Sequence, residues 1–367
     1  MFKFNDVFTD CTKYVTKLKT SEYKESGKNI IIDQGQNEIA GYTNNEEGLF
    51  EDIPALIFGD HTRCIKYINK PFYIGADGVK ILKIKLEKAN YKYWYYALKN
   101  INIPNTGYNR HFKWLKGLSF KKHTLIEQQK IVDKLDIISV LINQRQLQLK
   151  LLDDLIKARF VEMFGDIHNS KLYPYVNIDS ITTVLSGGTP DRKVEEYWDN
   201  GSIRWVKTTE LQNCVITDTE ERITQAGMDN SSAKIVPIGS VLIAMYGQGK
   251  TRGMTGYLAV ECTTNQACAC ILPTKKINQI FLWKYMILSY DKLRNMAKGG
   301  NQPNLNIGLI KKFPILFPPI ELQNQFADFV KEVDKSKFEV KKSLEKTQQL
   351  YESLMQKYFG QRDEEEI

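Results

Sequence analysis

The chain has 367 residues, of which 42% are hydrophobic and 26% charged, so it is long enough for two or three domains with hydrophobic cores. Its formal net charge of +8 favours a polyanionic partner only weakly, because many soluble proteins are as basic. The polar N-terminus and the lack of a long apolar run predict a cytoplasmic protein with no signal peptide and no membrane contact. None of the six cysteines forms a C-x-x-C pair, which favours structural thiols over a metal or redox site.

Residues 1–118 are predicted to form a first globular domain. Short strand-like runs (KNIIID, PALIFG, PFYIG and GVKILKIKL) are separated by turn-forming residues. An aromatic helix is expected near residues 90–100, and the polar stretch NTGYNRHFKWLK follows it. This order predicts a domain that mixes helices and strands.

Residues 119–165 are predicted to be a spacer made of one long helix. The segment from about Glu127 to Met163 contains neither glycine nor proline. Its apolar residues recur at intervals of three and four, with one polar break at Arg145, which is the pattern of a coiled-coil seam. A second such helix is predicted from about Leu322 to Phe359, within a spacer at residues 316–360, and an acidic tail at 361–367 follows it.

Residues 166–315, between the two spacers, are predicted to form a second globular domain of the same kind. The runs SIRWVKT, KIVPIGSVLIAMY, TGYLAVE and QACACILP resemble strands. The segment INQIFLWKYMILSYDKLRNMA resembles one helix, and the polar stretch KGGNQPNLN follows it.

The two halves of the chain are related by a shift of 195 residues. Both long helices end in Phe-Gly, and the same shift places Gln128 on Gln323 and Leu149 on Leu344 without a gap. Upstream, it places Leu115-Lys116 on Ile310-Lys311 and residues 91–99 on residues 286–294. We therefore predict an α+β fold in which an internal duplication gives two mixed α/β domains and two long antiparallel coiled-coil helices with pseudo-twofold symmetry. About 37 helical residues would span roughly 55 Å, more than one turn of B-DNA at about 34 Å.

Both globular domains carry polar, amide-rich and basic loops. Arginine pairs with guanine and asparagine or glutamine with adenine through two hydrogen bonds, while lysine, tyrosine and backbone amides suit phosphates. One such loop alone is ordinary turn chemistry, but the set in both copies favours contact with nucleic acid. The predicted DNA-binding residues are Arg63, Lys66, Tyr108, Asn109, Arg110, Lys207, Gln248, Lys250, Arg252, Gln266 and Gln302.

Residues 244–251, AMYGQGKT, fit a nucleotide-binding pattern, but the context argues against an ATPase. A phosphate loop must open a helix, and the residues that follow, RGMTGY, contain two glycines and no helical periodicity. The segment LKLLDD at 149–154 resembles the partner strand of such a site, but it lies within a predicted long helix. No catalytic residues, metal ligands or cofactor loop are predicted.

The sequence resembles the specificity subunits of type I restriction-modification systems over nearly its whole length. The segments that carry the resemblance are FGDHTRCIKYINKPFYIGADGVKIL, NTGYNRHFKWLK, SGGTPDRKVEEYWDNGSIRWVKTTEL, TTNQACACILP, GNQPNLNIGLIKKFPILFPPIELQ and the helices ending in MFG and YFG. The sequence departs from the family pattern P-P-L-x-E-Q at the start of both helices: His123-Thr124 replace the two prolines in the first, and Leu322 replaces the glutamate in the second.

The resemblance implies a non-catalytic subunit that reads double-stranded DNA. In this family two target-recognition domains each read one half of a split site, and the paired helices set the spacer and dock two methyltransferase subunits. Restriction and translocation subunits join that complex, and S-adenosylmethionine, ATP and Mg²⁺ belong to the partners, with none bound by this chain. The helix residues expected to dock partners are Gln128, Leu135, Ile142, Leu149, Gln323, Val330, Leu344 and Tyr351.

Two other functions remain open at this stage. The chain could serve a fused restriction-methylation polypeptide of the type IIB or IIG kind, in which case the helices would dock one fused enzyme. More remotely, it could be a single-chain nuclease or a P-loop ATPase.

Overall fold

A computed structural model of the chain describes all residues except 76, 105, 108, 248, 297–303 and 361–367. Its residues divide into two compact units, which we call unit 1 (residues 1–147 and 341–367) and unit 2 (residues 148–340). Each long helix is therefore shared between the units, while the division into five segments at 118, 165, 315 and 360 stays a prediction. Among the described residues, no helix is both long and apolar enough to cross a membrane.

Unit 1 is built on two four-stranded sheets. One has the order β2-β9-β6-β7 and the other the order β3-β8-β4-β5. Their bounds are β2 Phe8–Asp10, β9 Val79–Ile84, β6 Ala55–Gly59, β7 Ile65–Ile68, β3 Lys17–Leu18, β8 Phe72–Gly75, β4 Asn29–Ile32 and β5 Gly41–Thr43. The short strands β1 (Phe2–Lys3) and β10 (Ser119–Phe120) pair with each other. Helices α1 (Phe4–Val7), α2 (Tyr91–Lys99) and α3 (Phe112–Leu115) and two 3₁₀ turns, Thr12–Tyr14 and Thr20–Glu22, complete the globular part of the unit.

Unit 2 repeats this plan around a five-stranded sheet of order β12-β19-β16-β17-β14. The bounds are β12 Val184–Ser186, β19 Cys268–Ile271, β16 Val241–Ala244, β17 Thr255–Leu258 and β14 Cys214–Ile216. A three-stranded sheet contains β15 (Glu221–Ile223), β13 (Ile203–Val206) and β18 (Thr263–Thr264), and β11 (Tyr175–Asn177) pairs with β20 (Pro314–Leu316). The helices are α5 Ile178–Ile181, α6 Gln225–Asp229, α7 Gln279–Leu288, α8 Tyr290–Met296 and α9 Ile307–Lys311, with 3₁₀ turns at Glu195–Tyr197 and Thr208–Glu210.

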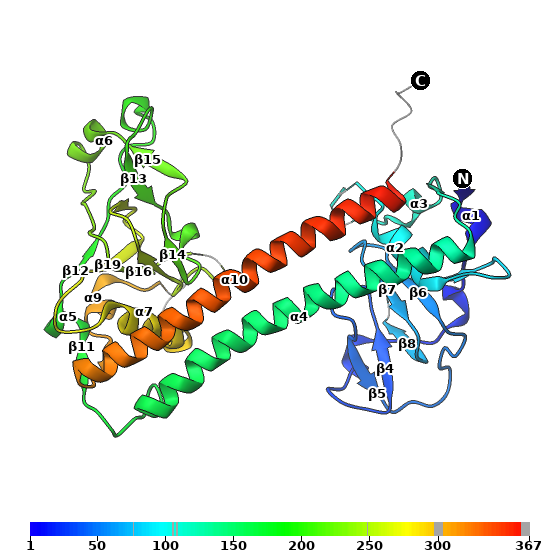
Figure 1. Cartoon of the computed structure of the whole chain (residues 1–367), viewed down its shortest axis with the longest axis horizontal. Helices are drawn as coiled ribbons and strands as arrows, with labels where there is room; N and C mark the ends of the chain where they lie inside the picture. The colour runs from blue at the N-terminus through cyan, green and yellow to red at the C-terminus, as the bar shows by residue number, and fades with distance from the viewer. Residues whose placement is uncertain (76, 105, 108, 248, 297–303, 361–367) are drawn as a thin grey trace. The chain divides into compact units, whose positions relative to one another are not determined.

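The two predicted long helices are present as α4 (Leu125–Phe164) and α10 (Ile320–Phe359), which can be followed in Figure 1. A capping box fixes the start of α4, because Thr124 N donates to Glu127 Oε2 at 2.8 Å and Glu127 N donates to Thr124 Oγ1 at 3.3 Å. Gly165 ends α4 with a φ of +78°, a left-handed conformation that favours glycine.

The two helices run antiparallel in both units. In unit 1, Lys134 of α4 donates to Tyr358 of α10 at 3.5 Å, and further along α4 Ser139 contacts Tyr351. In unit 2, Asp153 of α4 pairs with Lys337, and further along α4 the ring of Phe160 lies 5.6 Å from that of Phe326. In each case the residue number falls along α10 as it rises along α4.

The side-chain contacts bear out the internal duplication around the two helix starts. Buried Gln128 donates from Nε2 to His123 O at 3.0 Å, and Gln323 donates to Pro318 O at 2.7 Å. Both the glutamines and their acceptors are 195 residues apart. The two helices therefore begin in the same way in both units.

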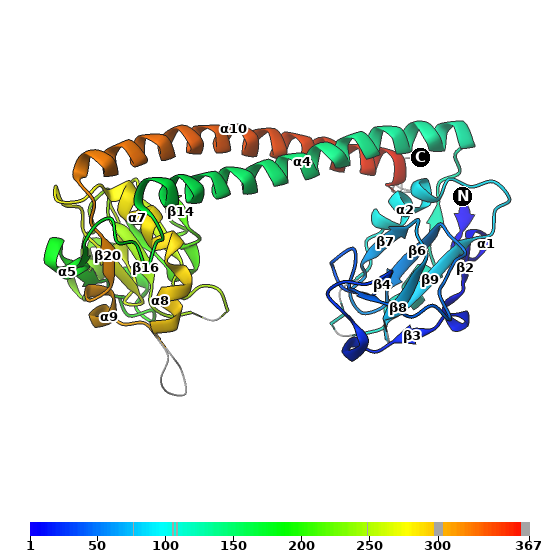
Figure 2. The same ribbon diagram turned by 90° about the horizontal axis from the view of Figure 1, so that it is seen from below.

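The prediction that residues 91–99 correspond to residues 286–294 is wrong. Asn90 caps α2 and donates to Gln129, while Asn278 caps α7 and donates to Asn324, so α2 corresponds to α7 with a shift of 188. Both helices lie between a sheet and the long helices of their own unit (Figures 1 and 2). The predicted single helix at 277–297 is in fact α7 followed by α8, and these added residues explain why the shift changes to 195 by α9.

Candidate nucleic-acid interface

Three loops of unit 1 are joined by backbone hydrogen bonds at Asp60. Asp60 N donates to Gly78 O at 2.6 Å, which joins the β6–β7 loop to the β8–β9 loop. His111 N donates to Asp60 O at 2.8 Å, and Phe112 N donates to the buried Asp60 carboxylate at 2.7 Å, which adds the segment that precedes α3. We call these three segments the three-loop cluster of unit 1.

Unit 2 has the same three-loop cluster, centred on Met245. Met245 N donates to Ala267 O at 2.8 Å, which joins the β16–β17 loop to the β18–β19 loop. Leu305 N donates to Met245 O at 3.1 Å, which adds the segment that precedes α9. Met245 and Asp60 therefore hold equivalent places in the two units.

The first loop of each cluster closes on a residue in the left-handed region. Arg63 N donates to Gly59 O at 2.7 Å with φ +61° at Arg63, and Gly253 N donates to Ala244 O at 2.9 Å with φ +88° at Gly253. The loops differ in length, since Asp60–Thr62 are three residues and Met245–Arg252 are eight. The described residues of the segment AMYGQGKT thus end β16 and belong to its connection to antiparallel β17, and they open no helix that could cradle a nucleotide.

Most of the predicted DNA-binding residues that the structure describes lie in the two clusters. In unit 1, Arg63, Asn109 and Arg110 come from the β6–β7 loop and the segment before α3. In unit 2, Lys250 and Arg252 come from the β16–β17 loop and Gln266 comes from the β18–β19 loop. Lys250 and Gln266 are exposed. Three further predicted residues, Tyr108, Gln248 and Gln302, lie outside the described residues. Hydrogen bonds across loops, rather than closeness in sequence, bring these groups together.

Lys66 lies away from the surface and does not belong to this set. Its side chain is buried, and Nζ donates to Asp33 O at 2.9 Å and to Asn37 O at 2.6 Å. The Asp33 carboxylate lies 3.6 Å from the ammonium. The lysine therefore stabilises the loop after β4 and does not present a charge to DNA.

Lys207 also lies outside the three-loop cluster. Its ammonium is 2.8 Å from Glu220 and 2.9 Å from Glu221, and hydrogen bonds to these carboxylates raise its pKa. Two neighbouring carboxylates would oppose the approach of a phosphate. As a DNA contact Lys207 stays a prediction that this ion-pair network does not support.

The basic segment GGTPDRK has a structural role in unit 2. The guanidinium of Arg192 lies 3.6 Å from the ring centroid of Trp198 and 4.7 Å from that of Trp205, and it pairs with Glu221. The indole of Trp205 donates to Gly188 O at 3.0 Å. The segment thus fixes the edge of the β15-β13-β18 sheet.

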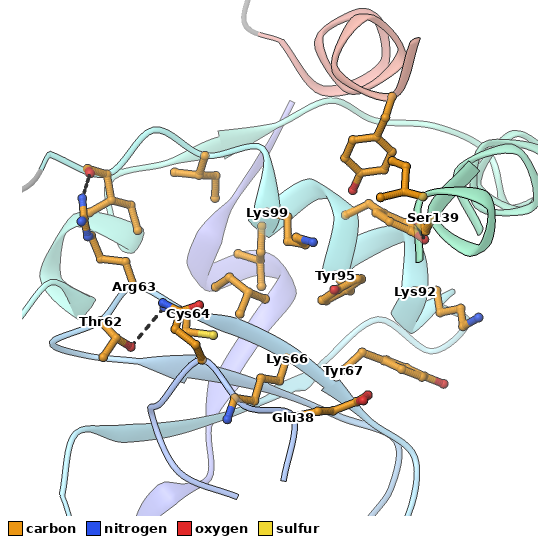
Figure 3. A pocket seen from close by; sticks show the side chains of 18 of the residues that line it. Glu38, Thr62, Arg63, Cys64, Lys66, Tyr67, Lys92, Tyr95, Lys99 and Ser139 are labelled. Atoms are coloured by element: carbon orange, nitrogen blue, oxygen red, sulfur yellow. Dashed lines mark hydrogen bonds between the residues drawn. The ribbon is translucent and has the colours of Figure 1, made fainter. Parts of the chain in front are cut away.

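An open cavity of about 940 Å³ adjoins the cluster of unit 1 and extends along α2 (Figure 3). The Lys99 ammonium stands 5.4 Å from the ring centroid of Tyr95, one helical turn before it, and Arg63 lines the same space. Burial raises the pKa of Tyr95, so its phenol remains protonated at neutral pH. Lys99 and Tyr95 are candidate contacts that were not predicted from the sequence, although their spacing of four on a mostly buried helix was a usable signal.

Half of the residues predicted to dock partners are buried, and the other half are partly buried. Leu135, Gln323 and Val330 are fully buried, Gln128 is 4% exposed, and Ile142, Leu149, Leu344 and Tyr351 are half-buried. Because a coiled-coil seam faces its own partner helix, these residues hold α4, α10 and the sheets together. The exposed apolar residues of α4 form a different set: Leu125, Ile126, Ile137, Val140, Leu141, Leu147, Leu151, Leu155 and Val161.

Three buried cysteines of unit 2 have no reactive character. Burial raises the pKa values of Cys262 and Cys268, and it raises that of Cys270 to about 11. Protonated thiols are poor nucleophiles and poor metal ligands. Within the described part of the chain, no group of three or more His, Cys, Asp or Glu residues is placed to hold a metal ion.

Comparisons with known proteins agree on one family. Residues 171–350 match the family model described as the type I restriction modification DNA specificity domain. The specificity subunit of the type I restriction enzymes EcoR124I and EcoR124II of Escherichia coli is 25% identical over 347 residues, which cover 88% of this chain and 83% of that protein. The MjaIX specificity subunit of Methanocaldococcus jannaschii is 28% identical over 185 residues, which cover 47% of this chain and 41% of that protein.

Two solved structures have the same fold. The S subunit of a type I restriction-modification system from M. genitalium aligns with a TM-score of 0.62 at 15% identity, over 98% of this chain and 96% of that one. A chain from a structural study of complex assembly and conformational transition in the type I system aligns with a TM-score of 0.52 at 14% identity, over 96% of this chain and 97% of that one.

Proposed function

We propose that this chain belongs to the family of type I restriction-modification DNA specificity subunits, and that the three-loop cluster of each unit reads one half of a bipartite DNA sequence. The observation that supports this proposal is the repetition of the cluster. The same backbone hydrogen bonds, at Asp60 and at Met245, join three polar loops in both units. A site present twice in one chain suits a target that has two halves.

The side chains in the clusters suit both parts of DNA recognition. Arg110 in unit 1 and Gln266 in unit 2 can pair with base edges, where a good bidentate contact discriminates by about 1–3 kcal/mol. Arg63 Nη1 and Asn109 Nδ2 already donate to Ile103 O and Thr106 O, so these two side chains would have to exchange those contacts for DNA. Lys250 suits the DNA backbone, because an ammonium binds phosphate as a point charge without reading the sequence. The cavity residues Lys99 and Tyr95 would extend the contact surface of unit 1.

The proposal includes partners that carry out the chemistry. Two methyltransferase subunits would dock against the exposed apolar residues of α4, since an apolar helix face that remains exposed marks an interaction surface. Restriction and translocation subunits would join through them, and S-adenosylmethionine, ATP and Mg²⁺ would be bound by these partners. This chain would supply the sequence specificity.

A domain exchange tests the proposal. Residues 1–118 are replaced by the corresponding domain of another specificity subunit, and the methylated sequence is determined by methylome sequencing of the host. We expect one half of the recognised sequence to change and the other half to stay the same. A change in both halves, or in neither, would show that the units do not read separate half-sites.

A further inference from the structure

Unit 2 has two additions that its counterpart in unit 1 lacks. The β16–β17 loop has eight residues between the hydrogen-bonded Ala244 and Gly253, where the β6–β7 loop has three between Gly59 and Arg63. Helix α8 lies between α7 and α9, whereas the described residues between α2 and α3 form no helix. The two additions lie far apart in the sequence.

The additions contact each other through two side chains of α8. Tyr290 Oη donates to Lys250 O at 2.7 Å, and Arg294 Nη1 donates to Arg252 O at 2.9 Å. Arg294 Nη1 also donates to Tyr290 Oη at 3.0 Å, and its guanidinium lies 5.3 Å from the tyrosine ring centroid. The two side chains therefore support each other and hold two carbonyls of the loop.

The loop has little rigidity of its own. Gly247, Gly249 and Gly253 have φ values of +144°, +58° and +88°, and glycine gives up more conformational freedom than any other residue when it is fixed. At Gly253 the backbone is close to α8, since a Cβ there would stand 3.3 Å from Arg294 Cγ and 3.4 Å from the Tyr290 ring. The contacts from α8 thus supply the order that the loop sequence does not.

We propose that Tyr290 and Arg294 are positioning residues for the second half-site, and that they hold the β16–β17 loop in the shape in which Lys250 meets a DNA phosphate. This inference rests on the proposed function. The Lys250 side chain is exposed, while its carbonyl is fixed by Tyr290. Loss of the Tyr290 hydroxyl group would therefore release the backbone that carries the Lys250 ammonium, without removing any charge.

Tyr290→Phe tests this inference through the salt dependence of DNA binding. The full chain, in the complex that it forms with its partner subunits, is titrated with a duplex that carries the recognised sequence at several salt concentrations. Each phosphate contact contributes about 0.9 to the slope of log K against log[salt]. We expect Tyr290→Phe to weaken binding about three- to tenfold and to reduce the slope by about 1, although it removes no charge.

A double-mutant cycle separates positioning from a general loss of stability. If Tyr290 acts through Lys250, adding Tyr290→Phe to Lys250→Gln should cause little further loss, while its effect should add to that of Arg110→Gln in unit 1. Lys292→Gln is the matched control, because Lys292 also lies on α8 but its ammonium faces Phe313, at 5.9 Å from the ring centroid. It should leave affinity and slope near those of the wild type.

An unchanged salt slope in Tyr290→Phe, or full additivity with Lys250→Gln, would overturn the inference. A lower melting temperature with an unchanged slope would assign the pair a purely structural role and would overturn it as well. Arg294→Gln provides a second variant if Tyr290→Phe does not fold. Because this substitution removes one positive charge itself, its effect on the salt slope is measured with and without Lys250→Gln. Full additivity of the two substitutions would also overturn the inference. If the wild-type complex binds specific and unrelated duplexes equally, the proposed function itself fails.

Discussion

Gln323 is completely buried at the start of α10, and both ends of its amide are hydrogen-bonded. Nε2 donates to Pro318 O at 2.7 Å, and Oε1 accepts from Asn278 N at 2.8 Å. Its counterpart Gln128 makes only the first of these contacts among the described residues, and its Oε1 is buried without a partner. The same residue type therefore contributes differently in the two units.

We expect Gln323→Leu to lower the free energy of unfolding of unit 2 by about 2–4 kcal/mol, because two buried backbone groups lose their partner. Gln128→Leu is the matched variant in unit 1, where one backbone group is affected, and it should cost about 1–2 kcal/mol. Urea denaturation followed by tryptophan fluorescence measures both. Equal effects, or loss of partner binding without loss of stability, would contradict the structural role of Gln323.

Lys284 is a buried charge in unit 2 whose effect depends on pH. Burial lowers its pKa below the usual 10.5, although Asp334 lies 3.2 Å from its ammonium and opposes the shift. The folded state therefore releases this proton at a lower pH than the unfolded state does. The contribution of Lys284 to stability rises with pH from its lowered pKa up to about 10.5.

Lys284→Met should remove this rise. The free energy of unfolding of the wild type minus that of the variant should increase as the pH rises towards about 10.5, because the unfolded state holds the proton longer than the folded state does. Denaturation curves of both proteins at several pH values measure it. A difference that is constant or decreases over this range would show that the folded state does not lower the pKa of Lys284. The exposed Lys341→Met serves as a control for loss of a surface charge.

At the scale of elements, α4 differs from α10 in what it exposes. The exposed large apolar residues of α4 include Ile137, Val140 and Leu141 in unit 1 and Leu151 and Leu155 in unit 2, whereas those of α10 are Phe338 and Leu350. Residues three and four apart share a helix face, so each part of α4 presents an apolar strip. The buried residues of the same helix pack against other parts of this chain.

Charged substitutions on α4 should separate partner binding from stability. We expect Ile137→Glu and Leu151→Glu to abolish co-purification of methyltransferase subunits while they change the free energy of unfolding by less than about 1 kcal/mol, because exposed sites tolerate polar residues. Lys341→Glu on α10 is the control. Retention of the partners by both α4 variants would show that docking occurs elsewhere.

At the scale of the whole molecule, antiparallel pairing means that a change in one long helix requires a matched change in the other. We expect deletion of seven residues from both α4 and α10, at positions 195 apart, to shorten the spacer of the recognised sequence by about three base pairs. Seven residues correspond to about 10 Å of helix rise, and one base pair to about 3.4 Å. Methylome sequencing gives the spacer directly. An unchanged spacer would exclude the helices as its ruler, and deletion in one helix alone should destabilise the protein.

Several features were predictable from the sequence because they depend on local patterns. The long helices, predicted at 127–163 and 322–359, extend over 125–164 and 320–359, since period and end signals lie within the helices themselves. Strands β4, β6, β8 and β9 coincide with apolar runs, but β2 and β7 were missed because polar residues interrupt their apolar runs.

The sequence alone determined the two-helix architecture, the duplication and the resemblance to type I specificity subunits, because helical period and repeated spacing are properties of the order of residues. Tertiary structure decided which of the candidate residues meet. Strand register and backbone hydrogen bonds at Asp60 and Met245 bring the loops of each three-loop cluster together, and burial removes Lys66 from the surface. The insertion of α8 makes α2 correspond to α7 with a shift of 188 residues instead of 195. These outcomes depend on contacts between segments far apart in the chain, which no local pattern encodes.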